Sequence, residues 1–390
     1  MTNKRKRLLI RLRWLERRRK RRDRKKAVGR KRKTNSGFRD FFIGLKERDV
    51  ASITGKKELI NGQWVPKGVL VLTMPEVFDF ESNYEQSARL IAVFRRALEN
   101  LVRIRYIDFS RMHKASVACA VVFTCYADLW KHLCVSVRPV TNTWHPGIRE
   151  LFSQVGFFKA MRYKCETDGV GISTSPYVFK DLRGYFITNE SRNLSQFAKD
   201  YPAIRADMES LIGGSLNDIA RSYYCSISEA VTNIYHHAYD KVNRSWFFDK
   251  WWISIAFDKT ANELVVIVFD HGKGIPATAW KTKMFSSYMR FSKELDEFLS
   301  LRRLTSEIQR KVLFLVFEQS ASIARKQGRG HGCADIKSLL GNIKGGKLSV
   351  ISLQAKYENG NYKGNKSVRG ESKSLAVPLQ GTLLEWRIPL

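Results

Sequence analysis

The sequence predicts a mixed α/β protein with two folded parts behind a basic N-terminal arm. Three observations favour this fold class. Segments with strand and helix patterns alternate between residues 69 and 155. In the C-terminal half, a long helical segment is followed by apolar strands. A chain of 390 residues, 44% of them hydrophobic, can bury two or three cores, which excludes a wholly disordered protein.

Residues 1–35 form the predicted arm. Residues 1–33 carry 19 Lys and Arg residues against two acidic ones, which is about half of the net charge of +32. Because charges this dense repel one another, we expect the arm to be disordered until a polyanion neutralises it. Contact with RNA or DNA phosphates through residues 1–34 is the favoured interpretation, without base specificity. A membrane-surface helix and a solvated tail are the alternatives.

The next part of the chain is predicted as a connector, residues 36–65, ending in a turn at Asn61-Gly62. A small α/β domain follows over residues 66–165, and a linking region over 166–210. Within this domain the pattern predicts three strands and three helices, the last helix ended by Gly156. The strands are expected at 69–73, 103–109 and 135–140, and the helices at 81–101, 115–132 and 146–155.

Two segments of this domain resemble the STAS domain, the fold of anti-anti-sigma proteins. They are residues 106–110, Tyr-Ile-Asp-Phe-Ser, and residues 147–157, Gly-Ile-Arg-Glu-Leu-Phe-Ser-Gln-Val-Gly-Phe. In the family, an Asp-Ser pair opens the helix after the first segment, and its serine is phosphorylated. Here Ser116 and Val117 stand at that position, which departs from the family pattern. The resemblance implies a domain through which a protein partner binds.

Polar side chains recur on one face of a helix predicted over residues 216–239. Glu229, Asn233 and His237 lie four residues apart, so they stack along the helix. These residues would be unusual in an apolar core, whereas they suit the wall of a polar pocket. A carboxylate there can take a proton from water, and an amide oxygen is a hard ligand for Mg²⁺.

Two glycine-rich segments follow this helix. Strands are predicted at 251–257 and 263–269, and the second runs into Asp270-His271-Gly272-Lys273-Gly274. Residues 328–332, Gly-Arg-Gly-His-Gly, lead into a helix expected at 333–340, where backbone N–H groups can hold phosphate. No Gly-Lys-Ser/Thr closes this segment as in a Walker loop. Two late strands are predicted at 347–353 and 382–388, and Gly381-Thr382 opens the last one.

In this order, these four signals resemble the GHKL ATPases, and most closely the anti-sigma-factor serine kinases. The resemblance implies a Bergerat-type ATP-binding domain over residues 211–390, with a two-layer α+β sandwich and a lid at 277–327. It also implies ATP and Mg²⁺ as cofactors. The resemblance implies that Glu229 is the general base, that Asn233 is the Mg²⁺ ligand, and that His237 fills the family's variable helix position. Asp270 would accept a hydrogen bond from the adenine amino group, supported by Thr382, and Gly272 and Gly274 would lie beside the base and ribose. The residues implied around the phosphates are Gly328, Arg329, Gly330 and Gly332.

Three functions are consistent with these features. The first is an ATP-binding, ATP-hydrolysing regulatory switch whose arm contacts nucleic acid, in a bacterial defence or signalling system. The second is a protein serine kinase acting on a STAS-like partner. The third is a nucleic-acid-binding module with ATP as a non-hydrolysed ligand. We favour the first, because a pocket that only binds ATP needs no base at Glu229.

Cysteine usage and hydropathy predict a cytoplasmic protein. The six cysteines form no Cys-x-x-Cys pair, which favours reduced thiols over a zinc site. The longest uncharged apolar stretch, residues 115–127, is too short for a transmembrane helix. No long apolar segment follows the N-terminal charges, so no secretory signal is expected.

Overall fold

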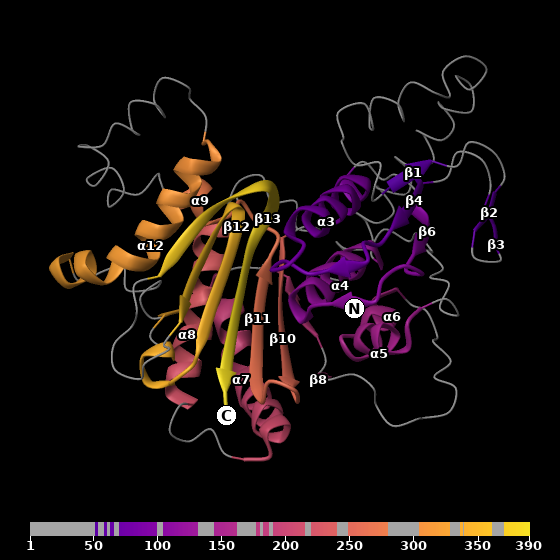
Figure 1. The fold of residues 1–390 in the computed structure, drawn as a ribbon. Helices are drawn as coiled ribbons and strands as arrows, with labels where there is room; N and C mark the ends of the chain where they lie inside the picture. Colours follow the sequence, from indigo (N-terminus) through magenta and orange to yellow (C-terminus); the bar gives the residue numbers. More distant parts are fainter. Residues whose placement is uncertain are drawn as a thin grey trace.

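The computed structural model is a mixed α/β protein in which helices pack on a three-stranded sheet and on a larger antiparallel sheet (Figure 1). The predicted arm, residues 1–35, lies outside the part of the chain that the structure describes. The described residues are 51–53, 58–60, 63–65, 70–99, 104–131, 144–161, 177–179, 182–186, 190–214, 220–239, 249–279, 304–327, 336–337, 339–360 and 370–390.

The N-terminal part, defined here as residues 51–161, contains a three-stranded sheet in the order β1-β4-β6. The strands β1 (Ala51–Ile53) and β4 (Leu70–Thr73) are antiparallel, whereas β4 and β6 (Ile104–Asp108) are parallel. A parallel pair needs a crossover connection, which α3 (Tyr84–Glu99) supplies. The other elements are β2 (Glu58–Ile60), β3 (Gln63–Val65), β5 (Val77–Phe78), β7 (Lys114–Ala115), α4 (Val117–Lys131), α5 (Pro146–Gln154) and α6 (Phe157–Met161).

Most predicted elements of this part are confirmed to within a few residues. The strand expected at 69–73 is β4, and the helix expected at 146–155 is α5, followed by Gly156 at φ +83°. Strands β2 and β3 pair on both sides of the predicted Asn61-Gly62 turn. The predicted connector also supplies β1 to the sheet, which the sequence missed because three residues carry no readable periodicity. The strand expected at 135–140 lies outside the described residues.

The C-terminal part, defined here as residues 177–390, is organised around an antiparallel sheet in the order β12-β13-β11-β10-β8, with β9 also paired to β10. Residues 166–210, predicted as a linking region, supply β8, β9 and α7 (Glu190–Ile212) to this part. The last two strands exceed their predicted lengths. In the first of them, charged residues such as Lys356 and Glu358 obscured the continuation. The strands are β8 (Tyr177–Phe179), β9 (Arg183–Phe186), β10 (Lys250–Asp258), β11 (Glu263–Asp270), β12 (Lys347–Gly360) and β13 (Glu371–Pro389).

Both faces of this sheet are covered by helices. Helices α7, α8 (Ala220–Asn233) and α12 (Ser306–Gln327) lie on one face, and α3 and α4 of the N-terminal part lie on the other (Figure 1). Alternate residues of one strand therefore enter different cores: Trp251 packs with the first set of helices, and Trp252 with the second. Burial on both faces explains the nearly unbroken apolar run at 263–269. The expected two-layer sandwich thus has a third layer here, supplied by the N-terminal part.

Helix α12 belongs to the packed body of the C-terminal part, although it falls within the predicted lid, 277–327. Its residues Ile308 and Val312 are buried against the sheet. Near its middle, Glu318 pairs with Lys337 and accepts a hydrogen bond of 2.5 Å from the Tyr357 hydroxyl. The remaining central range of that prediction, 280–303, lies outside the described residues. Among the helices that the structure describes, none is long and apolar enough to cross a bilayer.

Candidate functional site

Asp270 and Thr382, which are 112 positions apart in the chain, face each other across β11 and β13. They are register partners in the antiparallel pair, and their exposed fractions are 2% and 6%. The Asp270 Oδ1 atom accepts a hydrogen bond of 2.7 Å from the Gly272 N–H. Burial raises the pKa of Asp270 to about 7, against the opposing effect of hydrogen bonds from Gly272 and Thr382. This carboxyl group therefore changes its protonation state near neutral pH.

The glycines around Asp270 are required by close backbone approaches. A Cβ atom on Gly272 would lie 2.4 Å from the Ala238 carbonyl oxygen. Gly274 has φ +83°, and a Cβ there would lie 2.7 Å from the Leu353 side chain. Gly381 has φ +91°, and a Cβ there would lie 1.9 Å from the Asp270 carbonyl oxygen. The loop after β11 and the facing part of β13 therefore pack this closely only with glycine at these positions.

Ser352 is a residue of this site that the sequence analysis missed. It is fully buried, and its hydroxyl oxygen accepts a hydrogen bond of 2.9 Å from the Ile275 N–H. The same hydroxyl donates to the Gly381 carbonyl oxygen at 3.0 Å and lies 3.1 Å from the Thr382 hydroxyl. The next residue, Leu353, has φ +54° at a β-bulge. The sequence did not distinguish it, because β12 carries other polar residues such as Ser349 and Gln354.

Tyr239 and Gln380 also hold the loop after β11, and both were missed. The Tyr239 hydroxyl accepts a hydrogen bond of 3.0 Å from the His271 N–H and donates one of 2.5 Å to the Lys250 carbonyl oxygen. Gln380 donates from Nε2 to the Gly272 carbonyl oxygen at 2.8 Å. These bonds connect residues far apart in the chain, so spacing along the sequence does not reveal them.

The helix that carries Glu229 and Asn233 changes its geometry directly after Asn233. Residues Ile234–Ala238 form a π-helical turn, η1, where an α-helix was predicted to continue to residue 239. Glu229 and Asn233 remain four apart on α8 and are half-buried, whereas His237 is exposed on the π-helical turn. The structure therefore keeps the first two on one face and does not bury His237 with them. Such turns within helices are often found at functional sites.

The side chain of Asn233 is incompletely satisfied. Its Nδ2 atom is buried and has no hydrogen-bond partner. Leaving a buried amide group without a partner costs about 1–3 kcal/mol. At the far end of the π-helical turn, the Ala238 carbonyl oxygen accepts a hydrogen bond of 2.8 Å from the Lys273 N–H. The helix end that carries Asn233 is thus joined to the loop that carries Asp270.

The second glycine-rich segment is not placed by the structure. Gly328, Arg329, Gly330 and Gly332 all lie outside the described residues, between the end of α12 and Ile336. Within the described ranges, no group of three or more His, Cys, Asp or Glu side chains is arranged to hold a metal ion. A Mg²⁺ ion held by one side chain and by substrate phosphates needs no such group.

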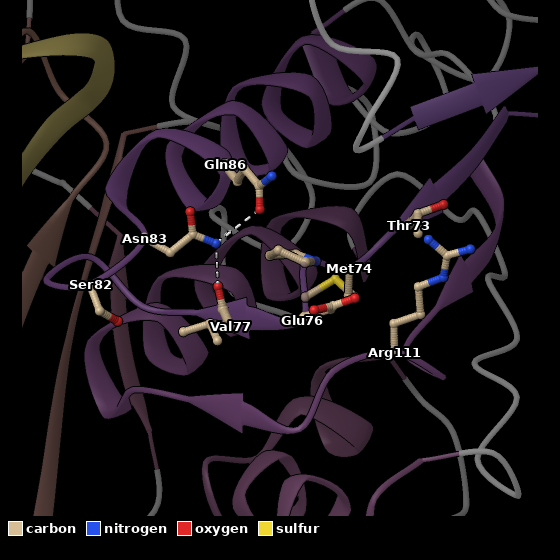
Figure 2. Close-up of a pocket in the computed structure, with 9 residues that line it drawn as sticks. Thr73, Met74, Glu76, Val77, Ser82, Asn83, Gln86 and Arg111 are labelled. Carbon is tan, nitrogen blue, oxygen red and sulfur yellow. Dashed lines mark hydrogen bonds between the residues drawn. The ribbon is translucent and has the colours of Figure 1, made fainter.

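A separate cavity of about 580 Å³ lies in the N-terminal part, where β4 ends and α3 begins. Figure 2 shows the Asn83 amide between two of its partners, the Val77 carbonyl oxygen at 2.7 Å and the Gln86 side-chain oxygen at 3.0 Å. The cavity contains none of the predicted nucleotide residues. Its lining residues are Thr73, Met74, Pro75, Glu76, Val77, Ser82, Asn83, Gln86 and Arg111.

Ser116, which stands near the family's phosphorylation position, precedes the first residue of α4. Its hydroxyl accepts a hydrogen bond of 3.3 Å from the Cys119 N–H, and its own N–H donates to the Phe78 carbonyl oxygen at 2.9 Å. The residue therefore acts as a helix N-cap.

Comparison with known proteins yields no family assignment. No family model matches the sequence, and no curated protein is significantly similar to it. The functional conclusion therefore depends on the residues around Asp270 and Asn233.

Proposed function

We propose that the C-terminal part binds ATP with Mg²⁺ and hydrolyses it, as a regulatory switch of the GHKL type. The observation that carries this proposal is the buried Asp270 carboxyl group, paired in register with Thr382 and bordered by glycines that tolerate no Cβ atom. A carboxylate in such a site accepts a hydrogen bond from the amino group of adenine. The glycines let the surrounding backbone pack closely enough to hold this carboxylate in place.

The residues at the end of α8 fit the phosphate end of the same ligand. Asn233 has a buried amide atom that lacks a partner, and it lies one π-helical turn from the Asp270 loop. Its amide oxygen would hold Mg²⁺ together with phosphate oxygens. When bound, the ion neutralises phosphate charge. Glu229, one turn earlier on the helix, would orient a water molecule and take its proton at the carboxylate.

Replacing the proposed base tests the hydrolysis step. Glu229→Gln keeps the shape of the side chain and removes its ability to accept a proton. We expect phosphate release to fall by about 10²–10⁴-fold while ATP affinity stays near that of the wild type. Glu371→Gln, at an exposed position on β13, is the matched control and is expected to retain full turnover. Unchanged hydrolysis by Glu229→Gln would remove Glu229 from the mechanism. Radiolabel transferred from ATP to protein would favour the serine kinase.

We also propose that residues 1–34 contact nucleic acid phosphates, on the basis of their dense positive charge. A protein making about 6–10 phosphate contacts loses about 10³–10⁵-fold in affinity between roughly 50 and 200 mM salt. We expect this steep dependence for labelled RNA or DNA, and its loss in a chain lacking residues 1–34. A scrambled arm of the same composition should bind as tightly, because phosphate contacts depend on charge. Full affinity without the arm would refute this contact.

A further inference from the structure

The N-terminal part shares a hydrophobic core with the sheet that carries Asp270. Residues from α3 and α4 pack in one cluster with Trp252, Phe269 and Leu383. At one edge of this contact, Asp128 on α4 pairs with Lys250 on β10 and accepts a hydrogen bond of 3.0 Å from Trp252 Nε1. The side chains of the ion pair are only 17% and 6% exposed. Such a buried, specific contact fixes how α4 lies on the sheet.

Helices α3 and α4 also contact the loop after β11 and the residues next to it. The Tyr126 ring on α4 meets the His271 ring edge to face, with centroids 5.0 Å apart. On α3, Arg95 donates from its guanidinium group to the Gln380 Oε1 atom at 3.2 Å. Gln380 in turn donates from Nε2 to the Gly272 carbonyl oxygen. Two helices of the N-terminal part therefore contact residues in or next to the loop.

These bonds form a continuous path from α3 to the Asp270 carboxylate. Arg95 orients the amide of Gln380, so that its Nε2 atom points to the Gly272 carbonyl oxygen. The N–H of the same glycine bonds to Asp270 Oδ1. Both backbone polar groups of Gly272 are thus occupied, one by the N-terminal part through Gln380 and the other by the carboxylate. Displacing Arg95 would free the Gln380 amide to rotate and weaken the hold on the loop.

We propose that Arg95 and Gln380 are positioning residues for the nucleotide site, which is complete only when the N-terminal part is docked on the sheet. This inference rests on the proposed ATP site and adds how that site is controlled. Neither side chain has to touch the nucleotide. Because coupling between sites is reciprocal, ATP binding would strengthen the docking of the N-terminal part by the same factor that docking strengthens ATP binding. A partner that displaces α3 or α4 from the sheet would then release ATP.

The test compares ATP affinity and loop protection in full-length variants. Arg95→Ala and Gln380→Ala are each expected to weaken ATP binding about tenfold. The double variant should bind no more weakly than either, because both substitutions interrupt the same path of hydrogen bonds. Arg95→Lys keeps a cationic donor and should restore part of the affinity. The control is Arg89→Ala, whose arginine pairs with Glu85 on the same helix and should bind ATP like the wild type. Affinities are measured well below the unfolding temperature of each variant.

Hydrogen exchange of the nucleotide-free chain separates this inference from the proposed function. Arg95→Ala should speed exchange in a peptide covering residues 270–275, whereas Arg89→Ala should not. Wild-type ATP affinity in both Arg95→Ala and Gln380→Ala would overturn the inference and leave the ATP site standing. Absence of ATP binding in the wild type would overturn the ATP site. If the wild type does not bind ATP, exchange still tests the positioning role. Exchange at 270–275 in Arg95→Ala that equals the wild-type rate would overturn that role, and faster exchange would support it.

Discussion

Asp270→Asn is expected to reduce ATP affinity about 100-fold or more while leaving the fold intact. The amide keeps the size of the carboxyl group, and its oxygen can still accept the hydrogen bond from the Gly272 N–H. The other amide atom is then an N–H₂ group, which faces the amino group of adenine donor to donor. Losing a hydrogen bond to a charged group and leaving donors unmatched costs about 3 kcal/mol, and every 1.4 kcal/mol is tenfold in affinity. Titration calorimetry with ATP measures the difference directly.

Asp258→Asn is a matched control for this variant. Asp258 is also a buried aspartate at the end of a strand, and it accepts hydrogen bonds from the N–H groups of Thr260 and Ala261. It lies at the opposite end of the β10–β11 pair from Asp270. We expect Asp258→Asn to change stability and not ATP affinity. Equal loss of ATP binding in both variants would indicate general damage to the sheet, and wild-type affinity in Asp270→Asn would refute the adenine contact.

The pH dependence of binding gives this prediction a second readout. Burial raises the pKa of Asp270 to about 7, and the adenine contact needs the ionised form. Affinity should therefore rise about tenfold from about pH 6 to about pH 8, with proton release on binding near neutral pH. His271 and Tyr239, which lie beside this carboxyl group, do not titrate there: burial and then the Arg95 cation lower the pKa of His271 to about 3, and burial raises that of Tyr239. In Asp270→Asn the residual affinity should vary much less between these pH values than it does in the wild type.

Gly381→Ala is expected to destabilise the protein by about 3 kcal/mol or more. The added methyl group would lie 1.9 Å from the Asp270 carbonyl oxygen, so β11 and β13 must separate at the site. Clashes in packed regions cost about 1–3 kcal/mol, and backbone strain at positive φ adds about 1–3 kcal/mol. Urea unfolding followed by circular dichroism measures the loss.

Gly156→Ala separates the two causes. Gly156 has φ +83°, similar to that of Gly381, but a Cβ atom there meets nothing within 4 Å. The control therefore reports backbone strain alone, about 1–2 kcal/mol. A Gly381→Ala variant no less stable than Gly156→Ala would show that β11 and β13 are not packed as described.

The sequence predicted the elements around the site better than their packing. The apolar runs at 251–257 and 263–269 identified β10 and β11, because continuous burial leaves a clear hydrophobic pattern. The same pattern does not say what covers the second face of the sheet. The docking of α3 and α4 there depends on contacts between segments more than 100 residues apart, such as Tyr84 with the Val377 carbonyl oxygen. Edge strands of three or four residues, such as β8, were too short to recognise.

The residues of the candidate site were also predicted only in part from the sequence. Motif order predicted that Asp270, Gly272 and Thr382 belong to one site, and the structure places these residues next to one another. Ser352 and Gln380 were missed, because a single polar residue in a strand has the same pattern as an exposed one. The π-helical turn was also missed, since sequence periodicity assumes the α-helical 3.6 residues per turn. It leaves His237 exposed, although its spacing had placed it with Asn233.

The most direct test of the ATP site is titration of the full-length chain with ATP and GTP, each in the presence of Mg²⁺. The two nucleotides share their phosphates and ribose, and they differ where Asp270 is proposed to bind. Adenine offers an amino group to the carboxylate, whereas guanine presents a carbonyl oxygen at that position, which the carboxylate repels. We predict that ATP binds and that GTP binds at least about 100-fold more weakly. Equal affinity for both nucleotides, or binding of neither, would contradict the adenine site at Asp270.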